Sequence, residues 1–360
     1  MAPLRPRPGI LEIEPYVGGK ADVEGMANVI KLSANEAALG PSPKAIAALR
    51  AAVPVVHRYP DGGARALRQA IGARFDLDPE RVVCGAGSDE LIQLLMRAYA
   101  GPGDEVLYSA HGFLMYRLCA LAIGATPVAA PEPDLKTDVD AMLARVTSRT
   151  RAVFVANPNN PTGSYLTQDE LARLHAGLPG DVLLVVDAAY AEYIDRDDYT
   201  TGQELALRTG NVVMTRTFSK LFGLAALRLG WLYAPPDVID VLHRVRGPFN
   251  VSALAQTAGI AALEDLEHQE RERANNDCWR PWLAEQLAGL GLRVHPSVAN
   301  FVLVGFSEGR SAPAASAWLE RHGILARPMA AYGLPQCLRI SVGHEAENQA
   351  VVARLREFVT

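Results

Sequence analysis

Short apolar runs of strand length alternate with helix-patterned segments between about residues 44 and 235. The runs are DEVLYS, TRAVFVANP, DVLLVVDAAY, NVVMTR and LGWLYA. Ahead of them, SPKAIAALRAAV places Ile46, Leu49 and Val53 at helical spacing behind a Ser-Pro start. Continuous apolar strands that alternate with helices are typical of a parallel sheet covered on both faces. We therefore predict an α/β fold with a large domain at residues 44–235.

The pattern changes after residue 235. Helical stretches occupy about residues 252–290, and the apolar run ANFVLVGF, a helical segment and the short strand-like runs GILAR and CLRISVG follow. This order is typical of a smaller α+β domain, which we predict at residues 236–360. Residues 1–43 are rich in proline and glycine, so we expect an N-terminal arm that joins the smaller domain or reaches a partner subunit.

The composition excludes several classes of protein. The 360 residues are 49% hydrophobic and 21% charged, an ordinary globular balance that is sufficient for two domains. The net charge of −5 is spread along the chain, which argues against a nucleic-acid-binding protein. No apolar run reaches the roughly 20 residues that a membrane span needs. The N-terminal segment is too broken by proline for a secretory signal. We expect a soluble cytoplasmic protein.

The four cysteines are far apart in the sequence and form no CxxC or His-Cys cluster. This spacing favours reduced thiols over a disulfide or a zinc site, and we expect no bound metal. The cysteines are Cys84, Cys119, Cys278 and Cys337.

Two cations lie within the apolar stretch VVMTRTFSKLFGLAALRLGWLYA. They are Lys220 and, eight residues later, Arg228. A buried cation is costly unless it is paired or used. Phe218, Leu221 and Phe222 flank Lys220, and a desolvated ammonium has a lowered pKa, which makes it a usable nucleophile and base. The alternative is an ordinary solvated lysine.

A glycine turn follows the strand-like run RVVC. In GAGSDE, Gly85 and Gly87 allow the backbone to turn tightly before Ser88 begins a helix. Free N–H groups at a helix start bind anions, typically phosphate. Ser88 or Asp89 would serve equally well as an ordinary helix cap, so this segment alone decides nothing.

Two more polar segments follow strands, where ligands bind in open α/β sheets. The segment ANPNNPTG either directs an amide side chain towards a ligand or is only a structural turn. Asp187 ends VLLVVD, with Tyr190 three residues later, and is either a cap or an anion that needs a cation. Pyridoxal phosphate is held by four kinds of group: a lysine, a carboxylate, a phosphate-binding turn and an arginine. Its carbonyl needs an amine, its pyridine nitrogen an anion, and its phosphate both amides and a cation.

The ordered segments NPNNPTG, DAAYAEY, TFSKLFGLAALRLG and LRISVG resemble the fold-type I pyridoxal-phosphate aminotransferases of class I and II. The resemblance covers nearly the whole chain and implies a large domain with a mostly parallel sheet plus a smaller α+β domain. Four further segments are similar to those members that transfer the amino group of L-histidinol phosphate to 2-oxoglutarate. The products are imidazole-acetol phosphate and L-glutamate, in histidine biosynthesis. The segments are EPYVGGK, KLSANEAALGPSP, RYPDGGARALRQAI and GAGSDELIQLLMRAY.

The resemblance also implies roles for single residues. Lys220 is implied to bind the cofactor covalently and to carry a proton, while Asp187 keeps the pyridine nitrogen protonated. Asn160 and Tyr190 are implied to bond the ring's 3′ oxygen, and Phe113 to stack on the ring. The phosphate-binding residues are implied to be Gly87, Ser88, Asp89, Thr217, Ser219, Arg228 and, from the neighbouring subunit of a homodimer, Tyr59.

Arg339 alternates with Leu338, Ile340 and Val342 in CLRISVG, so it faces away from that apolar set. It is either a solvated strand arginine or, as the resemblance implies, a bidentate fork for the carboxylate of glutamate or the substrate phosphate. The other substrate contacts implied by the resemblance are Arg327, Asn35 and, from the other subunit, Tyr16. Arg327 and Arg339 are interchangeable in this interpretation.

The chain departs from the family at the substrate mouth. Ala37 and Ala38 stand in NEAALG where the family has Asn-Pro, so we expect a looser loop, and HGF replaces a Pro-Thr start before Phe113. An aromatic amino-acid aminotransferase is therefore the main alternative. A lyase or decarboxylase of the same fold is disfavoured by Arg339. A non-catalytic phosphate-binding protein is disfavoured by Lys220 together with Asp187.

Overall fold

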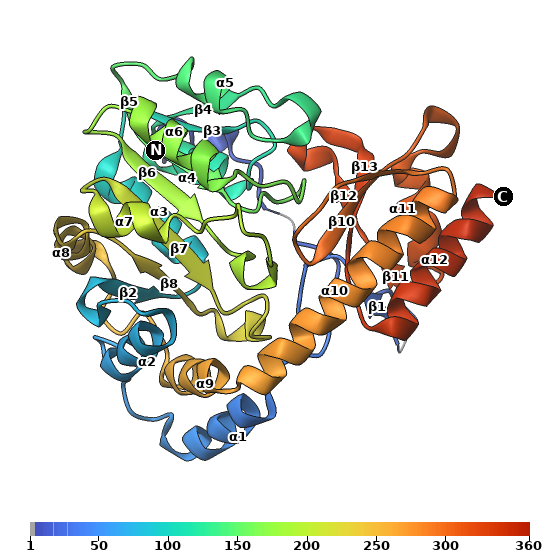
Figure 1. Cartoon of the computed structure of the whole chain (residues 1–360), viewed down its shortest axis with the longest axis horizontal. Helices are drawn as coiled ribbons and strands as arrows, with labels where there is room; N and C mark the ends of the chain where they lie inside the picture. Colours follow the sequence, from blue (N-terminus) through green and yellow to red (C-terminus); the bar gives the residue numbers. More distant parts are fainter. Residues whose placement is uncertain (1–3, 17, 27) are drawn as a thin grey trace.

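The computed structural model describes residues 4–16, 18–26 and 28–360. Its largest feature is a seven-stranded sheet in the order β2-β8-β7-β6-β5-β3-β4 (Figure 1). β8 runs antiparallel to both of its neighbours, and the remaining pairs are parallel. The strands are β2 (Val82–Gly85), β3 (Glu105–Ser109), β4 (Thr126–Ala130), β5 (Thr150–Ala156), β6 (Leu183–Asp187), β7 (Val212–Thr217) and β8 (Gly230–Tyr233). The predicted mostly parallel sheet is confirmed.

Helices cover both faces of this sheet (Figure 1). Along β6, Leu184 and Val186 belong to one buried cluster, while Leu183 and Val185 belong to the cluster on the opposite face. This two-sided burial explains why the strands are continuously apolar. The helices of this part are α1 (Pro43–Ala52), α2 (Arg65–Phe75), α3 (Ser88–Tyr99), α4 (Met115–Ile123), α5 (Val139–Leu143), α6 (Gln168–Gly177), α7 (Gln203–Arg208), α8 (Pro236–Val245) and α9 (Ala253–Glu264).

A second, smaller domain contains a four-stranded antiparallel sheet in the order β12-β13-β10-β9. The strands are β9 (Arg293–His295), β10 (Phe301–Gly305), β12 (Arg327–Met329) and β13 (Leu334–Ser341), and the helices are α11 (Ala312–Arg321) and α12 (Glu345–Val359). Short 3-10 helices occur in both domains at Ile10–Glu12 (η1), Val53–Val55 (η2), Pro79–Arg81 (η3), Pro133–Leu135 (η4), Ala191–Tyr193 (η5), Ala225–Leu227 (η6), Glu308–Arg310 (η7) and Ala330–Tyr332 (η8).

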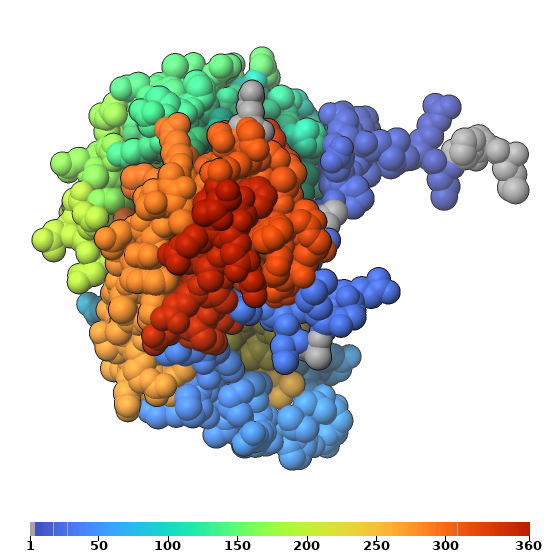
Figure 2. Space-filling model, turned by 90° about the vertical axis from the view of Figure 1, so that its right-hand side faces the viewer, coloured from blue at the N-terminus to red at the C-terminus, as the bar shows by residue number. Residues whose placement is uncertain are grey.

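The N-terminal arm contacts both domains. β1 (Ile30–Lys31) pairs in parallel with β11 (Ile324–Leu325), so this part of the arm joins the small domain. Nearer the start, Arg7 donates a 2.6 Å hydrogen bond to the carbonyl oxygen of Ala122 at the end of α4. Figure 2 shows the first described residues extending away from the body of the molecule, where Leu4 is fully exposed.

Helix α10 (Leu266–Gly289) crosses from the large domain to the small one (Figure 1). The sequence prediction divides the domains between residues 235 and 236. However, α8 and α9 lie beyond that division, and their buried residues belong to the clusters of the large sheet. Leu283 and Leu287, near the end of α10, belong to the small-domain cluster. We therefore propose that the domains divide within α10.

The four cysteines are free thiols. Within the described ranges, no helix is long and apolar enough to cross a membrane, and no three His, Cys, Asp or Glu side chains are grouped to hold a metal ion.

Candidate active site

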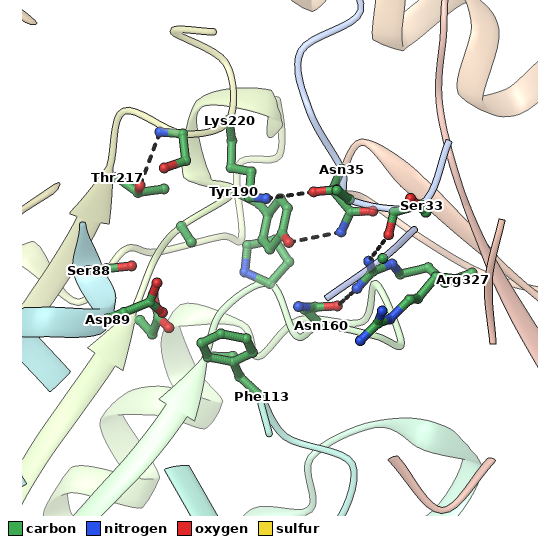
Figure 3. A pocket seen from close by; sticks show the side chains of 18 of the residues that line it. Ser33, Asn35, Ser88, Asp89, Phe113, Asn160, Tyr190, Thr217, Lys220 and Arg327 are labelled. Carbon is green, nitrogen blue, oxygen red and sulfur yellow. Dashed lines mark hydrogen bonds between the residues drawn. The ribbon is translucent and has the colours of Figure 1, made fainter. Parts of the chain in front are cut away.

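A pocket of about 210 Å³ lies between the two domains, at the carboxyl ends of the central strands (Figure 3). Asn160 follows β5, Asp187 ends β6, Thr217 ends β7, and Arg339 reaches in from β13. The sequence placed these polar groups at strand ends, and the parallel pairing brings the ends together. The predicted residues that line the pocket are Tyr16, Asn35, Ser88, Asp89, Phe113, Asn160, Asp187, Tyr190, Thr217, Ser219, Lys220, Arg228, Arg327 and Arg339.

One end of the pocket is built to hold an anion. Gly87 has φ +83° and is the cap residue of α3, its cap makes no side-chain hydrogen bond to the helix, and Ser88 and Asp89 at this helix start line the pocket. The alternative that Ser88 or Asp89 caps this helix is therefore not confirmed. The Arg228 guanidinium donates to Asp89 Oδ2 at 2.8 Å and to Ser219 Oγ at 3.3 Å. A helix start, a hydroxyl and a guanidinium together suit a phosphate.

Lys220 projects into the middle of the pocket (Figure 3). Its Nζ donates a 3.0 Å hydrogen bond to the carbonyl oxygen of Ala34 and lies 5.6 Å from the centre of the Tyr190 ring. Exclusion of water by the surrounding residues, aided by repulsion from Arg339, lowers the pKa of Lys220 from 10.5 to about 8. The sequence predicted such a lowering from the apolar neighbours of this lysine.

Asp187 is buried beneath the pocket. Tyr116 Oη and Thr215 Oγ1 donate hydrogen bonds to its two oxygens, at 2.9 and 3.1 Å. Burial nevertheless raises the pKa of Asp187 to about 6. A cation beside it, such as a protonated pyridine nitrogen, would favour the ionised form. Sequence reasoning missed Tyr116 and Thr215, because their contacts with Asp187 arise from strand and helix packing.

The opposite end of the pocket carries two arginines that lie directly across from each other in the β12–β13 register, Arg327 and Arg339. Arg339 is buried, which overturns the alternative of a solvated strand arginine. Its Nη2 donates to the carbonyl oxygen of Ser33 at 2.9 Å, and Nη1 donates to Asn160 Oδ1. Like charges opposite each other destabilise a sheet unless an anion lies between them, so this end also suits an anion.

Tyr190 and Asn160 have partners within the chain. Asn35 Nδ2 donates to Tyr190 Oη at 2.9 Å, and Asn160 accepts from Arg339 (Figure 3). Both side chains still border the pocket. Phe113 lies on another side of the pocket, edge-on to Tyr116 with ring centres 5.8 Å apart.

The two residues assigned to a neighbouring subunit differ in position. Tyr59 is 83% exposed, stacks on Phe249 with ring centres 4.7 Å apart, and lies outside the pocket of its own chain. Its contact with a neighbouring subunit stays a prediction. Tyr16 differs, because it lines the pocket of its own chain beside Arg327, and its contact with a neighbouring subunit likewise stays a prediction. The ion pair of Lys20 with Glu320 on α11 holds this part of the arm against the small domain of the same chain.

The aminotransferase class I and II family model matches residues 27–355. The chain belongs to the class I and II aminotransferases. A histidinol-phosphate aminotransferase from Rhodospirillum centenum is 62% identical, and one from Paramagnetospirillum magneticum is 60% identical, each over 98% of both chains. The solved structure of histidinol-phosphate aminotransferase from Sinorhizobium meliloti, in complex with pyridoxal 5′-phosphate, is 29% identical. It has a TM-score of 0.88 and covers 97% of this chain and 96% of that chain.

The pocket of this aminotransferase fits pyridoxal phosphate. The uncapped start of α3 and Arg228 match the phosphate, buried Asp187 matches the pyridine nitrogen, and Lys220 has the lowered pKa that covalent attachment requires. A Cβ on Gly87 would lie 2.5 Å from Arg228 Nη2, so only glycine allows the guanidinium to approach this turn.

Gly87→Ala is expected to weaken pyridoxal phosphate binding by about tenfold or more, because the new methyl group displaces Arg228 and strains the turn. Gly103→Ala is the matched control: its φ of +93° imposes the same strain, but a Cβ there meets nothing within 4 Å. Fluorescence titration of both apo variants with pyridoxal phosphate measures the difference. Equal affinities would show that Gly87 does not shape the phosphate site.

The rate of covalent attachment of pyridoxal phosphate to the apoenzyme is expected to rise with pH and to level off above about 8. Only the neutral amine is a nucleophile, and the lowered pKa of Lys220 makes that form abundant above this value. Below it, the rate should fall about tenfold per pH unit. Stopped-flow absorbance at the band of the attached cofactor follows the reaction. A rate that still rises steeply above pH 9 would contradict the lowered pKa.

Proposed function

We propose that this aminotransferase transfers the amino group of L-histidinol phosphate to 2-oxoglutarate, giving imidazole-acetol phosphate and L-glutamate in histidine biosynthesis. The observation that carries the proposal is a pocket with Lys220 between two cationic ends, in a chain 62% identical to a histidinol-phosphate aminotransferase over nearly its full length. The end at Arg228 would bind the cofactor phosphate. The end at Arg327 and Arg339 would bind a second anion, that of the substrate.

The cofactor site follows from the same geometry. When bound, pyridoxal phosphate supplies the electron-withdrawing ring on which the amino group is exchanged. Asp187 would hold the positive ring nitrogen, Phe113 would cover the ring, and Asn160 and Tyr190 would bond the ring oxygen. The residues proposed to hold the phosphate are Gly87, Ser88, Asp89, Thr217, Ser219 and Arg228.

Lys220 acts on the substrate as a base. Its pKa near 8 leaves part of the population neutral at neutral pH, so the amine accepts the proton that leaves the substrate Cα. Its hydrogen bond to the carbonyl oxygen of Ala34 fixes the amine in the middle of the pocket. Tyr190, whose ring lies beside the amine, restricts its movement.

Arg327 and Arg339 hold the anion of each substrate in turn. The phosphate of L-histidinol phosphate and the distal carboxylate of glutamate are both suited to a guanidinium fork, and the two half-reactions never require both anions together. Asn35 and Tyr16 border the same end of the pocket.

We also propose a cytoplasmic homodimer in which Tyr59 of the partner subunit reaches the cofactor phosphate. Tyr59 lies on the surface together with other exposed apolar side chains, a pattern that marks interaction surfaces. These side chains are Val53, Val55, Val56 and Phe249.

Absorbance spectra of the protein loaded with pyridoxal phosphate test the substrate. Titration with L-histidinol phosphate should convert the band of the Lys220-attached cofactor into that of the aminated cofactor. The concentration needed should be at least about tenfold below that of phenylalanine or tyrosine, because only the phosphate engages both arginines. Conversion by phenylalanine at the lower concentration would assign the chain to the aromatic aminotransferases. Release of pyruvate or CO₂ would indicate a lyase or decarboxylase.

A further inference from the structure

Helix α10 holds the loop between β1 and α1 through two buried side chains, one helical turn apart. Glu272 accepts hydrogen bonds from the backbone N–H groups of Ala38 and Leu39, at 3.0 and 2.9 Å. His268 Nε2 lies 3.0 Å from the carbonyl oxygen of Gly40, so this nitrogen carries the proton and donates. Both side chains are almost fully buried. The helix thus supplies an acceptor and a donor to the same short loop, residues 34–40.

Buried groups from both domains complete this arrangement. Tyr193 Oη donates to Glu272 at 3.1 Å, and Asn300 Nδ2 donates to the carbonyl oxygen of Asn35 at 3.1 Å. No cation forms an ion pair with Glu272 in the described part of the chain, so its buried charge is stabilised mainly by hydrogen bonds, with a smaller electrostatic contribution from His268. Burial raises the pKa of Glu272. Burial of a carboxylate without an ion pair lowers the stability of the fold. A role in the active site would explain why Glu272 is buried here.

The 34–40 loop touches the segment of Lys220 at two points. At one end, the Ala34 carbonyl oxygen accepts the hydrogen bond from Lys220 Nζ. At the other end, Gly40 packs so closely on Gly223 that a Cβ on Gly223 would overlap the Gly40 carbonyl oxygen. Between these points, Asn35 bonds the hydroxyl of Tyr190 (Figure 3). The position of the Lys220 amine therefore depends on the position of this loop.

We propose that Glu272 is a positioning residue for the transamination: by holding the turn at Ala38 and Leu39, with His268 at Gly40, it fixes the 34–40 loop against Lys220 and Tyr190. Glu272 does not line the pocket and acts only through the loop. From the sequence we expected a looser loop, because position 38 is not proline. The contacts with Glu272 hold this loop in place instead. The N–H of Ala38, which proline lacks, is one of the two groups that Glu272 holds.

Glu272→Gln tests the proposal with little change of volume. The amide places an NH₂ group against one of the two backbone N–H groups, so one hydrogen bond is lost. Hydrogen exchange of the apo protein should speed up in the peptide containing residues 34–40. Covalent attachment of pyridoxal phosphate to Lys220 and kcat should both fall about 10- to 100-fold, as expected for a misplaced reacting group. The matched control is Glu270→Gln, an exposed glutamate of the same helix that pairs with Arg273.

A second variant leaves α10 unchanged. Ala38 is the second residue of a turn closed by the Gly40 N–H and the Ala37 carbonyl oxygen at 3.3 Å, a position that favours proline. Ala38→Pro removes one donor to Glu272 and should give the same changes in exchange and attachment. Introduced into Glu272→Ala, the same proline should have little further effect, because the contact is already absent.

The proposal rests on the proposed function only for its kcat readout. Exchange and attachment are measured without any amino donor, so they test the loop even if L-histidinol phosphate is not the substrate. Wild-type exchange at residues 34–40 together with a wild-type attachment rate in both variants would overturn the proposal. So would faster exchange spread evenly over the whole chain, since that would show a loss of global stability rather than of loop position.

Discussion

Lys220→Ala is expected to lower transamination by at least about 10⁴-fold, the largest effect of any single substitution in this chain. The variant lacks both the amine that attaches the cofactor and the base that takes the substrate proton, and each function contributes separately to the rate. Single-turnover absorbance measurements with L-histidinol phosphate give the residual rate. The phosphate cradle at Gly87 and Arg228 is unchanged, so pyridoxal phosphate should still bind non-covalently.

The fold of this variant should persist, because removal of a desolvated ammonium relieves an unfavourable burial. Lys220→Arg is the complementary variant: arginine keeps the charge but does not lose its proton, so it should be equally inactive. Lys44→Ala, at an exposed lysine of α1, is the matched control and should retain full activity. Turnover near the wild-type level in Lys220→Ala would contradict the catalytic role assigned to this lysine.

Arg339→Lys is expected to lower kcat/KM for L-histidinol phosphate by about 10²- to 10³-fold. The substitution keeps the charge but removes the planar fork, and it leaves Asn160 Oδ1 and the Ser33 carbonyl oxygen without one of their donors. Loss of one partner from a buried charged hydrogen-bond network costs roughly 2–5 kcal/mol, or about 30- to 5,000-fold, and the expected loss lies in the middle of that range. Because the substrate anion is held in both half-reactions, the reaction with glutamate should weaken as well.

Steady-state kinetics with each substrate measures this effect, and the affinity for pyridoxal phosphate reports on the other end of the pocket. Figure 3 shows Arg327, the register partner of Arg339, across the pocket from Ser88 at the start of α3, so cofactor affinity should change by less than about threefold. Arg293→Lys, at an exposed arginine of β9 in the same sheet, is the matched control. An unchanged kcat/KM for L-histidinol phosphate would show that Arg339 does not hold its phosphate.

Much of the large domain follows from local pattern. The central strands β6 and β7 are buried at every position because both faces of the sheet are covered, and their apolar runs LLVV and VV carry this signal in the sequence itself. β4 was missed because it is a partly exposed edge strand that contains a proline. α8 and α9 were assigned to the smaller domain because a helical pattern shows that a face is buried but not which sheet buries it.

By itself, the sequence determined the central strands of the large sheet, the polar groups at their carboxyl ends and the apolar residues beside Lys220, whose pKa is lowered. The runs and the polar strand ends depend on residues that are neighbours along the chain, whereas the lowered pKa of Lys220 also depends on Arg339, which only the fold brings near. Only the tertiary structure decided which groups meet across it: Tyr116 and Thr215 at Asp187, and Glu272 at the loop that holds Lys220. Such contacts join residues tens to hundreds of positions apart. They depend on strand order, register and the path of α10, which local periodicity does not encode.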